Sequence, residues 1–582
     1  MRQLSELDAS FLYLESETAP MHIGGIYLFD ARGSGTPLTF STFVAYLRSR
    51  LHVVPVFRQR LKEIPFRLGR PYWVDDPEFS IERHLAYVNL GEYGQIHSLM
   101  ELAPKILEEP LKRDRPLWHI TFVDGFPADD DDDGNHGFAL IVKLHHAAID
   151  AFSGEEIMGK LLEYTPEART ITPPRPWFPR PGPSEERVIV QTGANLLRKP
   201  LQVTSLAMSA AEVTARSLVQ RQIRKLPLPF PLFSAPHSPF NRQITANRQI
   251  VSAEISLSRL KAIKANLADV TLNDVVLGLC AETLRRYLVN HDADADKSLV
   301  AMTPISVRSN SLRKATGNQM SAMLLDLATR EANPARRIRQ IHRNAVASEP
   351  YREAIAADRL TELLPSTMLA LSARLYSELQ IAQRYQPAFN LPITNVPGPQ
   401  VPLFLQGARL VRQYNSAPLF DSLGLVIVAV SYQGQLTINF TLCPDVVADG
   451  ESLKGLLEES LSTIETAAAA LPEEEEDRRQ PGVGGQSLTD EALTMLEGML
   501  RKTLRRLKAP SPATVIRTPS EGRYAFPLPR HYPRVLSTAP EYYRAAASMI
   551  APLPHPGPAC GRGSPATDHP RIRTQQPAHR RC

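Results

Sequence analysis

The stretch "FALIVKLHHAAIDAFSGEEIMGKLLEY", residues 138–164, changes its hydrophobic pattern part-way along. Its first half is a run of apolar and β-branched residues, which predicts a buried β-strand ending at His145 and His146. Ser153 and Glu156 then form an S-x-x-E capping box, which predicts the start of a helix. A strand, a sharp turn and a helix in succession indicate an α/β or α+β class and present side chains to a cleft.

The same mixture of elements occurs along most of the chain. Strands are predicted at 119–126 and 435–445, and "TLNDVVLGLCAETLRRYL" (271–288) predicts a strongly amphipathic helix. After residue 471 the chain is rich in Pro, Arg, Ser and Ala, with too little apolar material to offset its ordering entropy. We therefore expect an N-terminal lobe (1–164), a proline-rich and basic amphipathic linker (165–246), a C-terminal lobe (247–471) and a mostly disordered tail (472–582).

The composition is that of a globular protein rather than of a nucleic-acid-binding or membrane-spanning one. The chain has 582 residues, 43% of them hydrophobic and 22% charged, and a net charge of only +5. Its 4 cysteines stand at no zinc-ligand or redox spacing, which fits a reducing compartment. Neither a signal peptide nor a run of apolar residues long enough to span a membrane is visible, so we expect a cytoplasmic protein or one attached to a membrane surface.

The linker is the segment that could provide such an attachment. Its basic residues, among them Arg221, Arg224 and Lys225, alternate with Leu, Val, Phe and Ile. This composition is typical of an interfacial helix on an anionic membrane or lipid inclusion. A helix packed across the two lobes is an equally good interpretation.

Three residues of the opening stretch have the chemistry of a proton-transfer centre. Adjacent residues of a strand point to opposite faces, so only one of His145 and His146 can face a given cleft, which argues against a metal held by both. An imidazole titrates near neutral pH and can take a proton from a hydroxyl and return it to a leaving group. Asp150 would suit orientation or bracing of the turn. From spacing alone, two core histidines remain as good an explanation as catalysis.

Another candidate cluster is the run Asp129–Asp133 between two predicted strands. Five carboxylates could hold a cation, but on a short loop they more often keep a hairpin end solvated. We favour the hairpin interpretation.

Several motifs, in order along the chain, resemble one family. The H-H-x-x-x-D pattern resembles the active-site motif of the CoA-dependent acyltransferase superfamily. "LSELDASFLYLESETAPMHIGG", "RPLWHI", "PISVR", "GNQMS" and "NVPGP" narrow the likeness to the bacterial wax ester synthase/acyl-CoA:diacylglycerol acyltransferase family. The resemblance covers roughly Leu4 to Leu471.

The resemblance implies two chloramphenicol-acetyltransferase-like lobes with a tunnel between them, and it assigns roles to residues. It implies that His146 is the general base, that His145 supports it and that Asp150 braces the turn, with Arg308 as a candidate partner. Acyl-CoA would be a substrate, with diacylglycerol or a fatty alcohol as acceptor, and neither a metal nor another cofactor is implied.

Two further motifs have a structural as well as a functional interpretation. Asn273 and Asp274 match a family motif near the active site, so substrate binding is expected of them. Thr271 and Asp274 also form a T-x-x-D capping box, so the motif could be a helix start and nothing more. For "NVPGP" (395–399) and "PLW" (116–118) we favour a structural role beside the acyl channel.

One position departs from the family pattern. The motif usually ends Asp-Gly, but here Asp150 is followed by Ala151. If that position needs a positive φ, alanine costs about 1 kcal/mol and can displace the turn. The leading hypothesis is therefore an acyl-CoA-dependent O-acyltransferase, and two alternatives remain. One is a catalytically weakened lipid-surface protein of the same fold. The other is a condensation-type acyltransferase that uses carrier-protein thioesters.

Overall fold

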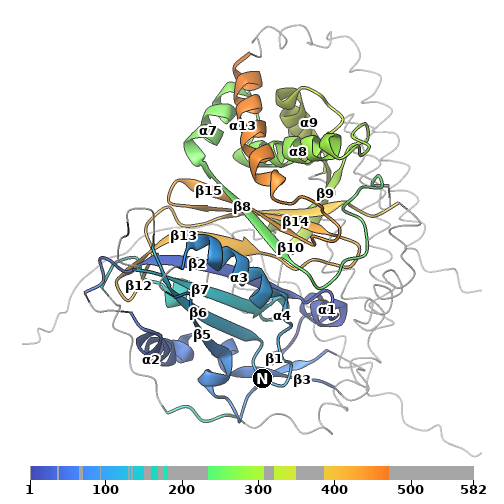
Figure 1. Ribbon diagram of the computed structural model, residues 1–582. Helices are drawn as coiled ribbons and strands as arrows, with labels where there is room; N and C mark the ends of the chain where they lie inside the picture. The colour runs from blue at the N-terminus through green and yellow to red at the C-terminus, as the bar shows by residue number, and fades with distance from the viewer. Residues whose placement is uncertain are drawn as a thin grey trace, which may run out of the picture. The chain divides into compact units, whose positions relative to one another are not determined.

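Two six-stranded sheets organise the computed structural model (Figure 1). The structure describes residues 2–35, 38–64, 70–91, 94–128, 132, 136–149, 159–167, 176–180, 234–306, 320–348 and 386–470. All of these belong to one compact unit, Met1–Arg479. The predicted disordered tail and most of the predicted linker lie outside the described residues.

The first sheet is built around the strand that the opening stretch predicts. Strand β7 (Gly137–His145) pairs antiparallel with β2 and with β6, and β5 adds a parallel edge. The strand order is β12 (Phe404–Leu405), β13 (Ala408–Ser416), β2 (His22–Asp30), β7, β6 (Trp118–Phe126), β5 (Leu85–Asn89).

Alternation along these strands gives the first sheet two apolar faces. Phe138, Leu140 and Leu144 pack with residues of α1 (Glu6–Leu14) and α2 (Phe40–Arg50). Ala139 and Ile141 point the other way, toward α3 (Ile96–Glu108). A small three-stranded sheet adjoins this lobe in the order β1 (Arg2–Gln3), β4 (Tyr72–Asp75), β3 (Gln59–Lys62).

The second sheet contains most of the strands of the C-terminal half. Its order is β10 (Met320–Asp326), β9 (Val300–Ser306), β11 (Leu391–Pro397), β14 (Leu425–Tyr432), β15 (Gln435–Leu442), β8 (Gln249–Ser256). Every residue of β14 is buried, which explains its apolar run from Leu425 to Val430. Helices cover one side of this sheet (Figure 1): α7 (Leu257–Asn266), α8 (Leu272–Asn290), α9 (Pro334–Ser348), α13 (Ser452–Ala470).

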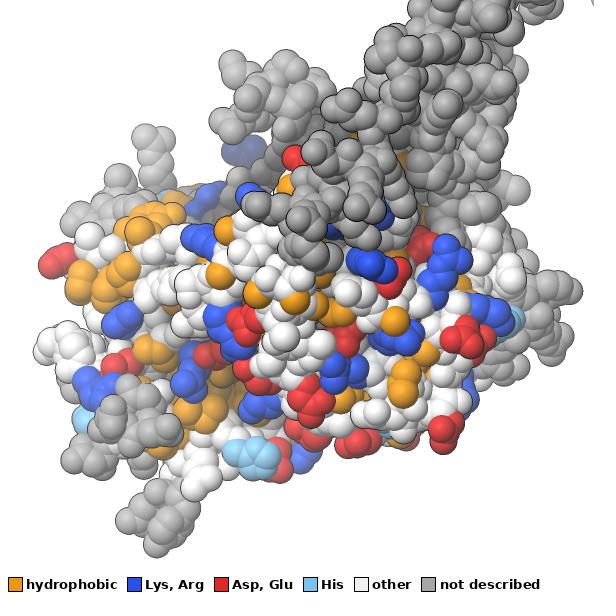
Figure 2. Space-filling view, turned by 90° about the horizontal axis from the view of Figure 1, so that it is seen from above, with side chains coloured by type: hydrophobic (Ala, Val, Ile, Leu, Met, Phe, Trp, Pro, Cys, Tyr) orange, Lys and Arg blue, Asp and Glu red, His pale blue; other side chains and the backbone are white. Residues whose placement is uncertain are grey.

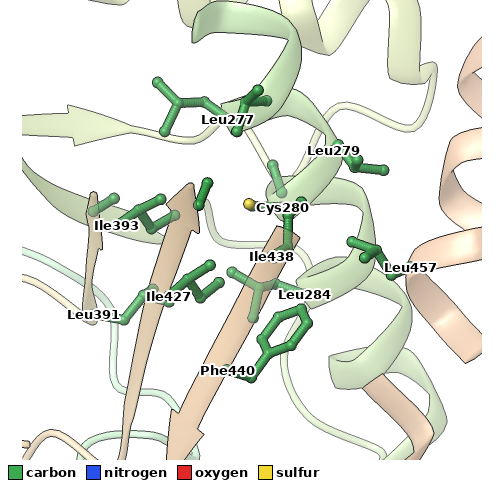
Figure 3. Packing of buried hydrophobic residues seen from close by; sticks show 14 of the residues in the cluster. Leu277, Leu279, Cys280, Leu284, Leu391, Ile393, Ile427, Ile438, Phe440 and Leu457 are labelled. Carbon is green, nitrogen blue, oxygen red and sulfur yellow. The ribbon is translucent and has the colours of Figure 1, made fainter. Parts of the chain in front are cut away.

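Helix α8 joins this sheet to the helical layer. Cys280 and Leu284 on α8 lie in one cluster with Ile438 and Phe440 of β15 (Figure 3). Each fully buried leucine of this kind contributes about 2 kcal/mol of transfer free energy. The predicted helix at 271–288 is therefore confirmed, and its apolar face is the face that packs.

The two sheets do not correspond strictly to the two halves of the chain. Strands β12 and β13 come from the C-terminal half, yet β13 pairs with β2 of the first sheet from Arg409 to Ser416. Glu163 also pairs with Phe404 of β12 through two backbone hydrogen bonds of 2.8 Å. The exchange ties the segment that follows the histidine motif to the other half of the chain. The expected boundaries at 164, 246 and 471 stay predictions.

Neither positive nor negative charge dominates the visible surface. Basic and acidic side chains are interspersed over the face seen in Figure 2. No helix among the described residues is long and apolar enough to cross a membrane.

Candidate active site

His145 is the last residue of β7, and its side chain is fully buried. Its Nδ1 accepts a hydrogen bond of 3.1 Å from the backbone N–H of Ala147, so the proton of the neutral ring lies on Nε2. That Nε2 lies 3.4 Å from Oε1 of Glu15. The ring is thereby fixed between the turn that carries His146 and the end of α1.

Glu15 belongs to this site, although nothing in the sequence pattern around it predicts this. It caps the C-terminus of α1, and Arg113 donates two hydrogen bonds to its Oε2, of 3.0 and 2.7 Å. Burial acts to raise the pKa of Glu15, but the contacts with His145 and Arg113 outweigh it and lower the pKa to about 2. Glu15 is therefore a carboxylate at neutral pH. A single acid after an apolar helix gives no sequence signal, because such residues are usually solvated.

His146 begins the short helix α4 (His146–Ile149) and is half-buried. Its ring stacks on Phe11 of α1 with centroids 3.7 Å apart, and its backbone N–H donates to the carbonyl of Met21 over 2.8 Å. Burial, with a smaller contribution from His145, lowers the pKa of His146 to about 4. At neutral pH the ring is uncharged and can accept a proton.

The position of His146 is where the two apolar cores meet. Phe11 packs against the core cluster of the second sheet, and Met21 belongs to that cluster. Ala147 and Ala148, which follow His146, belong to the core of the first sheet. The two histidines thus have different surroundings, although His146 begins helix α4 and does not continue strand β7 as expected.

A row of basic side chains lies behind His145 on the face of the first sheet that α3 covers. His22 is paired with His145, and His119 with Lys143, in the strand register. The His22 ring Nε2 lies 2.5 Å from the carbonyl oxygen of Leu107, and Lys143 donates to two further carbonyls at the end of α3. Burial lowers the pKa of His22 to about 3 and that of Lys143 to about 8. The row fixes the C-terminus of α3 under the candidate site.

Asp150, Ala151 and Arg308 lie outside the described residues. The bracing role of Asp150 and the cost of Ala151 therefore stay predictions.

Of the two residues expected to bind substrate, Asp274 has a clear structural role. It is 3% exposed, and its Oδ2 accepts hydrogen bonds from the backbone N–H and hydroxyl of Thr271 and interacts with His342 Nδ1 at 2.9 Å. This is the capping-box alternative, since both halves of the box are formed at the start of α8. A contact of Asp274 with substrate stays a prediction.

Asn273 is exposed and joins two motifs that are far apart in the sequence. Its Oδ1 accepts a hydrogen bond of 3.1 Å from Nδ2 of Asn395, the first residue of "NVPGP". The amide N–H groups of Asn273 make no hydrogen bond to the part of the protein that the structure describes. They are candidates for binding a substrate oxygen.

The remaining motifs have the structural roles expected of them. Trp118 of "PLW" donates to the carbonyl of Phe57 over 2.9 Å and stacks on the rings of Phe57 and His84. In "NVPGP" a Cβ on Gly398 would overlap the carbonyl oxygen of Ser431, so that turn requires glycine.

Asp132, the one described residue of the aspartate run, stabilises the hairpin loop between two strands. Asp132 accepts backbone hydrogen bonds of 2.8 Å from Ala128 and from His136, between β6 and β7. Its carboxylate is therefore used within the loop, in agreement with the hairpin interpretation.

Two domain models of one protein family match this chain. Residues 4–276 match the wax ester synthase/diacylglycerol acyltransferase catalytic domain, and residues 316–465 match the C-terminal domain of the same family. The chain belongs to the wax ester synthase/diacylglycerol acyltransferase family. The resemblance drawn from the motifs is thereby confirmed.

Individual members of the wax ester synthase/diacylglycerol acyltransferase family agree with this assignment. A Mycobacterium tuberculosis protein named provisionally as a diacylglycerol O-acyltransferase is 32% identical over 470 residues, covering 79% of this chain and 90% of its own. The O-acyltransferase WSD of Acinetobacter baylyi is 29% identical, covering 81% of this chain and 98% of its own. The solved wax ester synthase/diacylglycerol acyltransferase of Marinobacter aquaeolei VT8 is 26% identical, with a TM-score of 0.55 over 80% of this chain and all of its own. The predicted two-lobed α/β fold is confirmed.

The contacts of Glu15 lead to a prediction. In Glu15→Gln we expect kcat for acyl transfer to fall about tenfold, because His145 loses its anionic partner and the turn before His146 shifts. Glu17→Gln is the matched control, since Glu17 is exposed two residues further on. Equal kcat values for the two variants in an ester-formation assay would contradict the positioning role of Glu15.

Proposed function

We propose that the protein transfers the acyl group of a long-chain acyl-CoA to the hydroxyl of diacylglycerol or of a long-chain alcohol. The supporting observation is the uncharged, half-buried imidazole of His146 at the junction of two apolar cores. A long acyl chain needs such apolar surroundings, and a hydroxyl nucleophile needs a base that is unprotonated at neutral pH.

In the proposed mechanism Nε2 of His146 is the reacting nitrogen. Nδ1 of this ring is buried and so cannot reach the acceptor, which leaves Nε2 to react and assigns the proton of the neutral ring to Nδ1. Nε2 takes the proton of the acceptor hydroxyl, and the oxygen attacks the thioester carbonyl carbon. The carbon–sulfur bond then breaks, and the imidazolium returns the proton to the CoA thiolate. A thioester is already activated, so the transfer needs no acyl-enzyme.

The tetrahedral intermediate of this reaction needs hydrogen-bond donors for its oxyanion. Asn273 is the candidate, because Asn395 holds its carbonyl oxygen and leaves its amide N–H groups available. Glu15 and His145 act as positioning residues behind His146.

An assay with two acceptors tests the proposal. The purified protein is incubated with labelled palmitoyl-CoA and either hexadecanol or diacylglycerol. Ester with one or both acceptors is expected. No ester with either would favour the catalytically weakened lipid-surface protein, and Ala151→Gly would then show whether the alanine is the cause. Ester only from a palmitoyl carrier protein would favour the condensation-type alternative.

We also propose that the protein is cytoplasmic and peripheral to a membrane or lipid inclusions, since its acceptors, diacylglycerol and long-chain alcohols, are nearly insoluble in water. The basic residues expected to provide attachment, such as Arg221, lie outside the described residues. Flotation with anionic liposomes should decrease in Arg221→Gln/Arg224→Gln/Lys225→Gln. Undiminished flotation would contradict attachment through the linker.

The pKa of His146 predicts an unusual pH dependence of activity. A histidine with its ordinary pKa of 6.5 would lose activity as the pH falls through 6.5, whereas His146, at about 4, should stay neutral. We expect kcat/KM to stay level from pH 8 to about 5.5 and to fall only below about pH 5. A decline centred near pH 6.5 would contradict the assignment.

The same pKa values affect stability, and the direction follows from proton uptake. Burial lowers the pKa of His146 and His119 to about 4 and that of His22 to about 3. Unfolded histidines bind protons below pH 6.5 that the folded ones do not bind, so the free energy of unfolding should decrease as the pH falls from about 6.5 toward 4. Circular dichroism at each pH of the assay separates this loss from loss of activity.

A further inference from the structure

Helix α9 (Pro334–Ser348) presents a row of arginines on its outward face. Arg336, Arg339 and Arg343 recur at intervals of three and four residues, which places them on one side of the helix. Arg336 and Arg343 are exposed, and Arg339 is half-exposed. The helix contains no aspartate or glutamate, and neither Arg339 nor Arg343 makes an ion pair with any described residue.

The opposite face of α9 is anchored firmly. Arg337 is fully buried and donates hydrogen bonds to the carboxylate of Glu282 on α8 and to the carbonyl of Glu331. Ile338 packs where a Cβ on Gly278 would have to lie. The outward arginines therefore project from a backbone that is held in place.

The row begins beside the candidate substrate residues. His342, which precedes Arg343, lies 2.9 Å from Asp274 at the start of α8, while Arg337 meets Glu282 two turns further along α8. The two helices therefore run antiparallel, and Arg343 lies at the α8 end where Asn273 contacts Asn395. Arg339 and Arg336 lie progressively further from Asn273 along α9.

We propose that Arg336, Arg339 and Arg343 bind the phosphate groups of acyl-CoA, an inference that rests on the proposed function. CoA carries a diphosphate and a 3′-phosphate, and guanidinium groups bind phosphate oxygens in pairs. Arg336 and Arg343 are separated by about 10 Å along the helix axis, at 1.5 Å per residue, so the row can contact more than one phosphate. A carrier-protein thioester has a single phosphate, so the row favours CoA as the donor.

The test compares two acyl donors in Arg339→Gln/Arg343→Gln. We expect KM for palmitoyl-CoA to rise about tenfold, with kcat within about twofold of the unmodified protein. KM for palmitoyl-pantetheine, which has no phosphate, should be unchanged. Because these contacts are exposed, 0.5 M salt should reduce the difference in KM for palmitoyl-CoA. Lys261→Gln/Lys264→Gln on α7 is the matched control, since it also removes two cations, and both lysines are exposed and three residues apart on one helix.

A binding measurement keeps the test independent of catalysis. Adenosine 3′,5′-bisphosphate should bind the unmodified protein and the α7 control at least fivefold more tightly than the α9 variant, as measured by calorimetry. Equal binding to all three, or an equal rise of KM for both donors, would overturn the proposal. Loss of binding to phosphatidylglycerol vesicles with KM unchanged would overturn it too, in favour of a lipid surface. Failure of ester formation with intact nucleotide binding would contradict the proposed function alone.

Discussion

Replacing His146 by alanine should lower kcat for ester formation about a thousandfold while leaving the protein folded. The imidazole is the group that takes the acceptor proton and returns it to the leaving thiolate, and general acid–base catalysis of this kind contributes about 10² to 10⁴ in rate. The residual rate would come from holding donor and acceptor together. Initial rates with palmitoyl-CoA and hexadecanol measure the effect.

Two controls separate catalysis from structure in this variant. His97→Ala removes an exposed histidine on α3 that lies 3.2 Å from Glu101, and its kcat should match that of the unmodified protein. Thermal unfolding of His146→Ala shows whether loss of the stack on Phe11 unfolds the site. A folded His146→Ala protein that retains full kcat would remove His146 from the mechanism.

Replacing Glu282 by alanine should destabilise the protein by about 3–5 kcal/mol. Glu282 accepts a hydrogen bond from the fully buried Arg337 and one of 2.7 Å from Arg286. Burial lowers the pKa of Arg337, and Glu282 opposes that shift. Without the carboxylate a guanidinium would remain buried and uncompensated, which is the costly way to break an ion pair. The denaturant midpoint, followed by circular dichroism, measures the change.

Glu459→Ala is the matched control for this prediction. Glu459 lies 3.4 Å from Arg286 in the same network, but its side chain is 63% exposed, so its loss should cost less than about 1 kcal/mol. Replacing both partners, as in Glu282→Leu/Arg337→Met, should recover part of the stability, because no charge is then left buried. Equal midpoints for Glu282→Ala and Glu459→Ala would show that the buried pair contributes no more than the exposed one.

Local pattern predicted the elements of this fold well. Strand β7, the capping box of α8 and the apolar face of α8 could all be predicted from the sequence, because alternation and 3.6-residue periodicity are properties of neighbouring residues. The sequence did not predict that β12 and β13, from the C-terminal half, join the first sheet. A strand's sequence shows that it is buried but does not show which strand it pairs with.

The residues of the candidate site also fall into those that the sequence predicted and those that only the tertiary structure brought together. The sequence by itself marked His145 and His146, separated their faces and, through the family resemblance, assigned the base to His146. Only the tertiary structure brought Glu15, Arg113 and Phe11 to these histidines, and it placed His342 against the carboxylate of Asp274. The physical reason is that pairing and burial join residues far apart in the chain, and these contacts set the pKa and orientation of each group.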